Sequence, residues 1–253
     1  MPPVSSGKIT KFFAAISPFI ALAGIVVLQA QEYKKSVRKL NNADYLAQEQ
    51  QQARTVDWQK RSPHLGFANL KANLTYLDFV QYFGDSHARD TIGYKLVPDY
   101  FETINSIDPR FTKAHLSLSV ANSVYAGNPT QTIALMEQAL ESVDPESKDA
   151  AFLWTYKGLD ELLFMGDKQA AIDSYTMAAK WTSLTNKEDP ETIENLAIAL
   201  EDASEIELKE AQVRAWSGVL AYIRDNQRQR EIMNKIAGLK AEIAALEREN
   251  KVQ

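Results

Sequence analysis

Hydrophobic positions follow two patterns along this chain: one unbroken run near the start and short periodic rows after it. Residues 12–30 read FFAAISPFIALAGIVVLQA and carry no charge. About 20 such residues, rising 1.5 Å each in a helix, cross the hydrocarbon core of a bilayer. The run therefore predicts one transmembrane helix, which together with a short N-terminal tail makes up residues 1–30. Its large apolar side chains form the anchor: Phe12, Phe13, Phe19, Ile20, Leu22, Ile25, Val26, Val27 and Leu28.

A cleavable signal peptide is the alternative, with Lys8 and Lys11 as its basic end. The apolar stretch of a signal peptide usually has about 7 to 15 residues, fewer than this run. Cleavage after the small residues at 21–23 would also leave an apolar new terminus. An uncleaved anchor is therefore favoured.

The orientation of the anchor follows from the basic residues beside it. Two lysines precede the run, whereas four basic residues follow it: Lys34, Lys35, Arg38 and Lys39. Positive charge near a membrane tends to stay cytoplasmic. We therefore expect a single-pass membrane protein with its large domain on the cytoplasmic or stromal side.

Residues 31–65 are mostly polar and rich in Gln and Ala, with no Gly or Pro between residues 31 and 60. Gln, Glu, Ala, Lys and Arg favour helix. The stretch predicts a polar stalk or a flexible tether, and Ser62-Pro63-His64 marks its end, because the residue before a proline is pushed out of helix.

Helical periodicity begins at Gly66. Leu70, Leu74, Leu77 and Val80 are spaced i, i+4, i+7 and i+10, an amphipathic stripe of the kind that helices bury. Four aromatic residues flank the stripe, as further core or as a surface for a partner: Tyr76, Phe79, Tyr82 and Phe83. Gly84-Asp85 predicts the helix end, residues 86–97 a connection, and Pro98 the next helix.

The same arrangement then repeats. Helices are expected over residues 111–126, 130–143, 149–165 and 167–181, with another from residue 190. Pro109 and Pro145 lie 36 residues apart, and Gly127 and Gly166 lie 39 apart. Helix pairs at such a period indicate a helical solenoid, in which neighbours stack into one continuous core.

Residues 166–178 resemble the second helix of a tetratricopeptide repeat, with Gly166 at the turn, then Ala171, Tyr175 and Ala178. The preceding unit matches less closely. In the first helix of the third unit, Trp154 and Gly158 lie one place out of register. The resemblance covers residues 66–205 and implies a tetratricopeptide-like solenoid. Its repeat-packing residues would be Gly127, Met136, Ala139, Gly166, Ala171, Tyr175 and Ala178.

Residues 206–253 predict a helix that caps the solenoid, followed by a long helix. The apolar positions of the long helix alternate in steps of four and three, as in a heptad seam: Ile232, Ile236, Leu239, Ile243 and Leu246. This seam spans barely two heptads, so three outcomes stay open. It pairs with a second copy, packs on a partner, or folds back on the solenoid.

The net charge of −5 conceals a segregation along the chain. Residues 1–65 hold 9 Lys/Arg and 4 Asp/Glu (+5), residues 66–205 hold 10 and 22 (−12), and residues 206–253 hold 9 and 7 (+2). The basic stretch beside the membrane suits anionic lipid headgroups. The acidic middle excludes nucleic acid as the expected partner, because nucleic acid needs a basic footprint.

No residue set predicts catalysis. The chain has no cysteine, which removes thiol nucleophiles and cysteine metal sites. Its histidines, His64, His87 and His115, lack the spacing of a zinc-binding helix, and no glycine-rich phosphate loop occurs. We therefore expect no enzyme, no catalytic residue, no metal and no cofactor.

Two functions remain. The first is a membrane-anchored scaffold or assembly factor for a membrane complex, bound to subunits of that complex. The chain resembles tetratricopeptide proteins of bacteria and plastids that assist such assembly, which implies photosystems of the thylakoid as one setting. The alternative is a permanent structural subunit of a large membrane complex. A homo-oligomer through the C-terminal helix is compatible with either.

Overall fold

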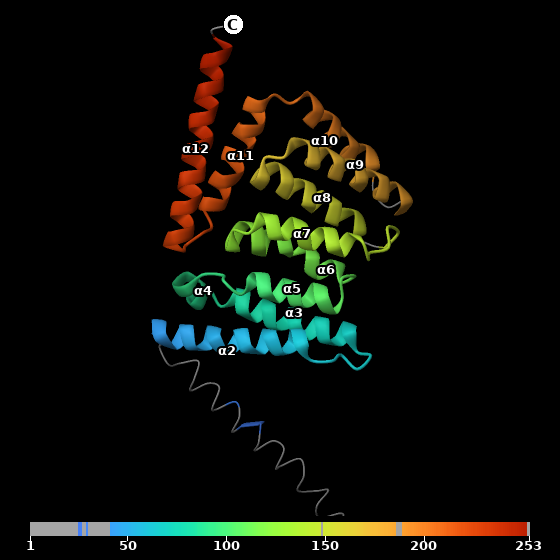
Figure 1. The fold of residues 1–253 in the computed structure, drawn as a ribbon, viewed down its shortest axis with the longest axis vertical. Helices are drawn as coiled ribbons and strands as arrows, with labels where there is room; N and C mark the ends of the chain where they lie inside the picture. Colours follow the sequence, from blue (N-terminus) through green and yellow to red (C-terminus); the bar gives the residue numbers. More distant parts are fainter. Residues whose placement is uncertain (1–24, 27–28, 30–40, 148, 186–188, 252–253) are drawn as a thin grey trace, which may run out of the picture. The chain divides into compact units, whose positions relative to one another are not determined.

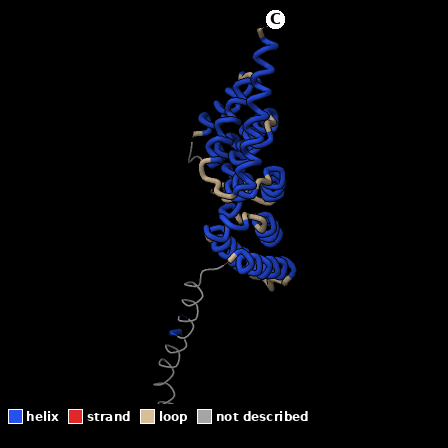
Figure 2. Tube along the Cα trace, turned by 90° about the vertical axis from the view of Figure 1, so that its left-hand side faces the viewer, coloured by secondary structure: helices blue, strands red, loops and turns tan. Residues whose placement is uncertain are grey.

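The structure, a computed structural model, describes residues 25–26, 29, 41–147, 149–185 and 189–251. All regular secondary structure in these ranges is helical and none is strand, which confirms the all-α class (Figures 1 and 2). The helices from residue 42 onward, in chain order, are α2 (Asn42–Arg61), α3 (Ala68–Gly84), α4 (Ser86–Ile92), α5 (Val97–Ile107), α6 (Thr112–Leu116), η1 (Ser119–Ala126), α7 (Pro129–Leu140), α8 (Ala150–Asp160), η2 (Glu161–Met165), α9 (Lys168–Thr185), α10 (Pro190–Asp202), α11 (Glu205–Leu220) and α12 (Asn226–Asn250).

The chain divides into two compact units, Met1–Asp44 and Tyr45–Gln253. We call the second unit the body. Within it, helices that are near in sequence pack together: α3 on α5, α7 on α8, α8 on α9, α9 on α10, and α11 on α12 (Figure 1). The body therefore builds its core largely from contacts between successive helices.

Glycine and proline set the helix boundaries in the middle of the body. Gly127 and Gly166 adopt left-handed backbone angles, with φ of 80° and 75°, and end η1 and η2. Pro129 occupies the first turn of α7, where its missing N–H leaves no hydrogen bond unmade. The helices predicted around these residues are confirmed. The two helices that precede these glycines differ from the prediction in one respect, since each ends in a short π-helix, η1 or η2.

Helix α2 corrects the predicted stalk. Val56 is buried in the cluster that also holds Phe79. The Gln59 side-chain amide donates to Asp78 at 2.6 Å, and the Tyr82 hydroxyl donates to Glu49 at 3.2 Å. The polar composition of residues 31–65 hid this packing, because α2 contributes few apolar side chains to it. From Tyr45 onward the segment is part of the body.

Helix α4 lies in the segment predicted as a connection. The Asp85 carboxylate caps it by accepting from the Ala88 N–H. Its Arg89 is buried, with the guanidinium 3.6 Å from the centre of the Tyr82 ring and 3.5 Å from a Glu49 carboxylate oxygen. A helix this short is held by these tertiary contacts, which periodicity does not reveal.

The predicted membrane anchor falls almost wholly outside the described residues. Of its members only Ile25 and Val26 are described, and both are exposed. Phe12, Phe13, Phe19, Ile20, Leu22, Val27 and Leu28 lie outside the described ranges. Among the helices that the structure does describe, none has the length and apolar character to span a bilayer.

Candidate interaction surface

Helix α3 carries apolar side chains on two opposite faces. Its inner face includes Phe79 and Tyr82, which are buried. The outer face, which we call the α3 face, consists of Leu70, Leu74, Leu77 and Val80. Their exposed fractions lie between 46% and 58%. The predicted helix is confirmed, but its leucine stripe faces solvent instead of the core.

The aromatic flank supplies the core instead. The Phe79 and Phe101 rings meet edge to face with centroids 4.7 Å apart, and Tyr82 lies 5.4 Å from Tyr100. The partner surface predicted for this flank is therefore wrong for Tyr82, whereas Phe79 is mostly core and also lines the groove described next. Aromatic rings bury more area than leucine and gain from such ring pairs. This favours the aromatic face inside when both faces of a helix are apolar.

Tyr76 and Phe83 are half-buried and, together with Phe79, line a groove of about 460 Å³ beside the α3 face. We call it the α3 groove. Val80 also lines it, with Leu116 and Val120 opposite, and no lining residue carries a charge. The groove therefore extends the α3 face toward η1 as one apolar, uncharged surface.

The residues predicted to pack the repeats lie inside the body. Met136, Ala139, Ala171, Tyr175 and Ala178 are buried, and the two glycines take the left-handed turns described above. Gly158, one place out of register in the sequence, meets Tyr175 directly. A Cβ added to Gly158 would lie 3.2 Å from Cε1 of the Tyr175 ring. This glycine therefore permits the close approach of α8 and α9.

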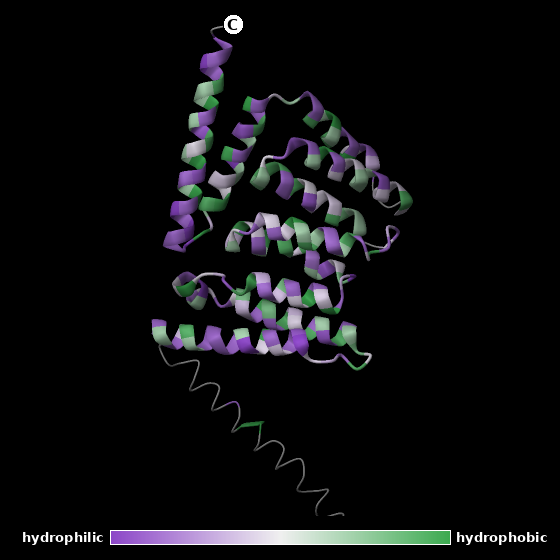
Figure 3. Cartoon of the chain, viewed as in Figure 1, coloured by the Kyte–Doolittle hydropathy of each residue, from purple (hydrophilic) through white to green (hydrophobic). Residues whose placement is uncertain are grey.

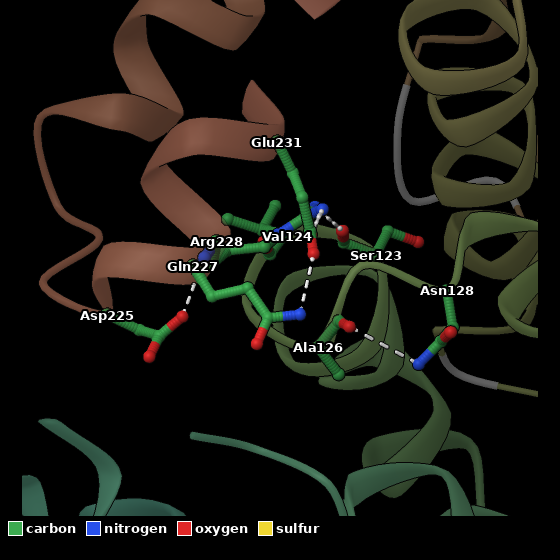
Figure 4. Close-up of polar contacts among 8 residues, drawn as sticks. All are labelled: Ser123, Val124, Ala126, Asn128, Asp225, Gln227, Arg228 and Glu231. Atoms are coloured by element: carbon green, nitrogen blue, oxygen red, sulfur yellow. Dashed lines mark hydrogen bonds and ion pairs between the residues drawn. The ribbon is translucent and has the colours of Figure 1, made fainter. Parts of the chain in front are cut away.

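A contact missed by sequence reasoning joins α12 to η1 (Figure 4). Arg228 Nη2 donates to the carbonyl oxygens of Ser123 at 3.2 Å and Val124 at 3.3 Å. A Cβ added to Gly127 would lie 2.6 Å from Arg228 Nη1. Gly127 thus supplies both the left-handed turn and the room for this guanidinium.

The same arrangement recurs one unit later. Gln212 of α11 donates from Nε2 to the Leu162 carbonyl oxygen at 3.0 Å, and a Cβ on Gly166 would lie 2.7 Å from that nitrogen. The last two helices therefore attach to the ends of η1 and η2 by one polar side chain each. Partners this far apart in sequence, 105 and 50 residues, leave no local signal.

The heptad seam of α12 is used within the chain over its first half. Ile232 and Leu239 are buried in a cluster with Trp216 and Phe164, and Ile236 packs against it. Ile243 and Leu246 are half-buried. Of the three outcomes left open by the sequence, the structure shows the fold-back for this half of the seam.

A buried polar cluster lies where α8 passes into η2. Asp160 accepts hydrogen bonds from the hydroxyls of Ser119 at 2.6 Å and Ser123 at 2.7 Å. Burial raises the pKa of this carboxyl from its ordinary 3.8 to about 6, against the lowering effect of the two serines. Lys157 pairs with Glu161 beside it. The cluster ties α8 and η2 to η1, and none of its members lines the α3 groove.

The histidines do not form a site. His64 and His87 are exposed, whereas the buried His115 has its ring nitrogens 2.8 Å from the Phe111 carbonyl oxygen and 3.0 Å from Asn105 Oδ1. Burial lowers the pKa of His115. In the part of the chain that the structure describes, no three His, Cys, Asp or Glu side chains are placed to hold a metal ion.

Comparison with known proteins adds no relative: no family model matches this sequence, and neither a curated protein nor a solved structure matches it. The function is therefore inferred from the surfaces of the body.

Proposed function

We propose that this protein is a membrane-anchored scaffold that binds a helical segment of a partner and assists the assembly of a membrane complex. The observation that carries this proposal is the α3 face. An apolar helix face is normally buried, and monomeric proteins rarely leave large contiguous apolar patches in water. The α3 face therefore favours a partner that covers it.

The geometry of the α3 face favours a helix as that partner. Leu70, Leu74 and Leu77 follow the four-then-three spacing that packs against a second helix. The α3 groove beside them accepts apolar side chains, as in complexes where an amphipathic helix lies in a groove. Neither the α3 face nor the α3 groove contains a charged side chain. The side of the partner helix that docks on them is therefore aliphatic and uncharged.

The body suits a scaffold in its construction as well. The ends of η1 and η2 fall at equivalent glycines, and Tyr175 fills the space over Gly158. Both features support a tetratricopeptide-like solenoid over residues 66–205. The uncharged run at residues 12–30 supports a membrane anchor, which raises the local concentration of the body near membrane partners.

Co-purification tests the proposal. The tagged full chain is extracted from native membranes in mild detergent, and bound subunits are counted by mass spectrometry. We expect substoichiometric recovery of a membrane complex, lost in the double variant Leu74→Glu/Leu77→Glu. Leu196→Glu on α10 is the matched control, because Leu196 is exposed to a similar extent, 47%.

The stoichiometry decides between the two functions. One-to-one recovery with a mature complex would make the protein a permanent structural subunit instead of an assembly factor. Equal recovery with the double variant and the wild type would contradict the assignment of the α3 face.

A further inference from the structure

Three large apolar side chains are exposed to solvent where α2 ends and the turn to α3 follows. Trp58 and Phe67 are each 67% exposed and Leu65 is 80% exposed. They lie within ten residues, and the segment joining the two helices is coloured partly apolar beside a mostly polar α2 (Figure 3). None of the three lines the α3 groove. Phe67 precedes Leu70 of the α3 face by three residues, so the protrusion borders that face and lies outside the α3 groove.

The backbone holds this protrusion in an unusual conformation. Leu65 and Gly66 both have positive φ, 49° and 85°, and the Phe67 N–H donates to the His64 carbonyl oxygen at 2.7 Å. A tight turn with two left-handed residues normally takes Asn or Gly first. Leucine in that position is strained and exposed at once. Such outliers are kept where they serve a function.

Basic side chains accompany the apolar ones. Arg54, Trp58 and Arg61 are spaced i, i+4 and i+7, so they share the face of α2 that points away from the buried Val56. Arg54 and Arg61 are exposed, and Arg61 makes a surface ion pair with Asp57 at 2.8 Å. Between residues 54 and 71 the chain holds four Lys/Arg and one Asp/Glu.

We propose that this turn, with Leu65 and Phe67, inserts into the surface of an anionic lipid bilayer together with Trp58, Arg54 and Arg61 at the adjoining end of α2. Tryptophan settles at the boundary between headgroups and acyl chains. Aliphatic and Phe side chains enter the acyl edge, and arginines contact the anionic headgroups. A protruding tip needs no matching pocket in a fluid bilayer, whereas a protein partner would have to supply one.

The fluorescence of Trp58 itself reports whether this part of the protein enters the bilayer. The full chain is reconstituted in vesicles of phosphatidylcholine alone or with phosphatidylglycerol, and its fluorescence is compared with that of Trp58→Phe. The difference isolates Trp58 from Trp154, Trp181 and Trp216, none of which is exposed. We expect a blue-shifted Trp58 emission that nitroxide-labelled lipids quench and aqueous iodide does not. The quenching should be stronger with phosphatidylglycerol.

Two variants and a control sharpen the test. Leu65→Glu/Phe67→Glu should abolish the quenching by lipid, and Arg54→Gln/Arg61→Gln should remove its dependence on phosphatidylglycerol. Leu196→Glu should change neither. Co-sedimentation with the vesicles reports the anchor separately, so a failure of the anchor is distinguishable from a failure of the turn.

Two results would overturn the inference. Continued access of iodide to Trp58 in vesicles would leave the turn in water. Protection from iodide in native membranes without quenching by nitroxide lipids would mean that a protein covers the turn.

Discussion

Asp160 shows what burial does to a single charged group in this body. Its carboxyl is enclosed, accepts from Ser119 and Ser123, and has a pKa raised by burial to about 6. Between pH 4 and 6 the folded state therefore holds a proton that the unfolded state has lost. By linkage, this group favours folding fully below pH 4 and loses that contribution as the pH rises through 6.

The substitution Asp160→Asn tests that linkage. A pKa shift of two units corresponds to about 3 kcal/mol. The buried charge of Asp160 therefore lowers the free energy of unfolding of the wild type by an amount of this order above pH 6. Asn keeps the shape without the charge, and its amide oxygen still accepts from one serine, whereas its NH2 group donates to the other. We expect the free energy of unfolding of Asp160→Asn, relative to wild type, to increase between pH 4 and pH 7. Urea unfolding at several pH values measures it, and parallel curves for the two proteins would contradict the account.

Gly127 gives a second test at the scale of one residue. Gly127→Ala places a Cβ against Arg228 and forces alanine into a left-handed turn, which alone costs about 1 kcal/mol or more. In the background of Arg228→Ala the steric part disappears and the backbone part stays. We therefore expect the two substitutions to be non-additive in urea unfolding, by about 0.5 kcal/mol or more. Additive effects would mean that the guanidinium simply moves aside.

At the scale of one element, α3 combines a buried aromatic face with an exposed aliphatic face. Phe79→Ala removes a buried ring and should lower the free energy of unfolding by about 3 to 5 kcal/mol. Leu77→Ala on the α3 face should change it by less than about 0.5 kcal/mol. Thermal unfolding of the two variants checks this contrast, and a large loss from Leu77→Ala would place the leucine stripe in the core after all.

The elements also show which features the sequence alone predicts. Pro129 and Gly166 fixed helix boundaries because proline and left-handed glycine act locally. Periodicity predicted α3 but not its orientation, since two apolar faces of one helix have the same period. The sequence did not predict helix α4, because contacts of the buried Arg89 hold this helix in place, not helix propensity.

Only part of the candidate interaction surface could be predicted from the sequence, because the rest depends on tertiary contacts. The aromatic flank of α3 was recognised, but its division into core residues and groove residues depends on what packs against each ring. The attachments of Arg228 and Gln212 join segments distant in sequence. Pairs of this kind carry no local pattern, so only the folded structure reveals them.

At the scale of the whole molecule, we propose different partners for two neighbouring surfaces, the turn before α3 and the α3 face with its groove. The turn before α3 combines apolar and basic side chains and would contact lipid, whereas the α3 face and groove are uncharged and would contact a protein helix. The anchor at residues 12–30 would keep both surfaces at the membrane. Residues 66–205 carry a net charge of −12, but the α3 face and the α3 groove within this range contain no charged side chain.

Photo-cross-linking at position 77 tests the central claim most directly. A benzophenone amino acid replaces Leu77 in the full chain, or Leu196 as the matched exposed position on α10, and the cells are irradiated before membranes are isolated. We predict that position 77 captures an uncharged aliphatic helix of a membrane-complex subunit, and that position 196 does not. Capture of nothing at position 77 beyond the level at position 196 would contradict the account.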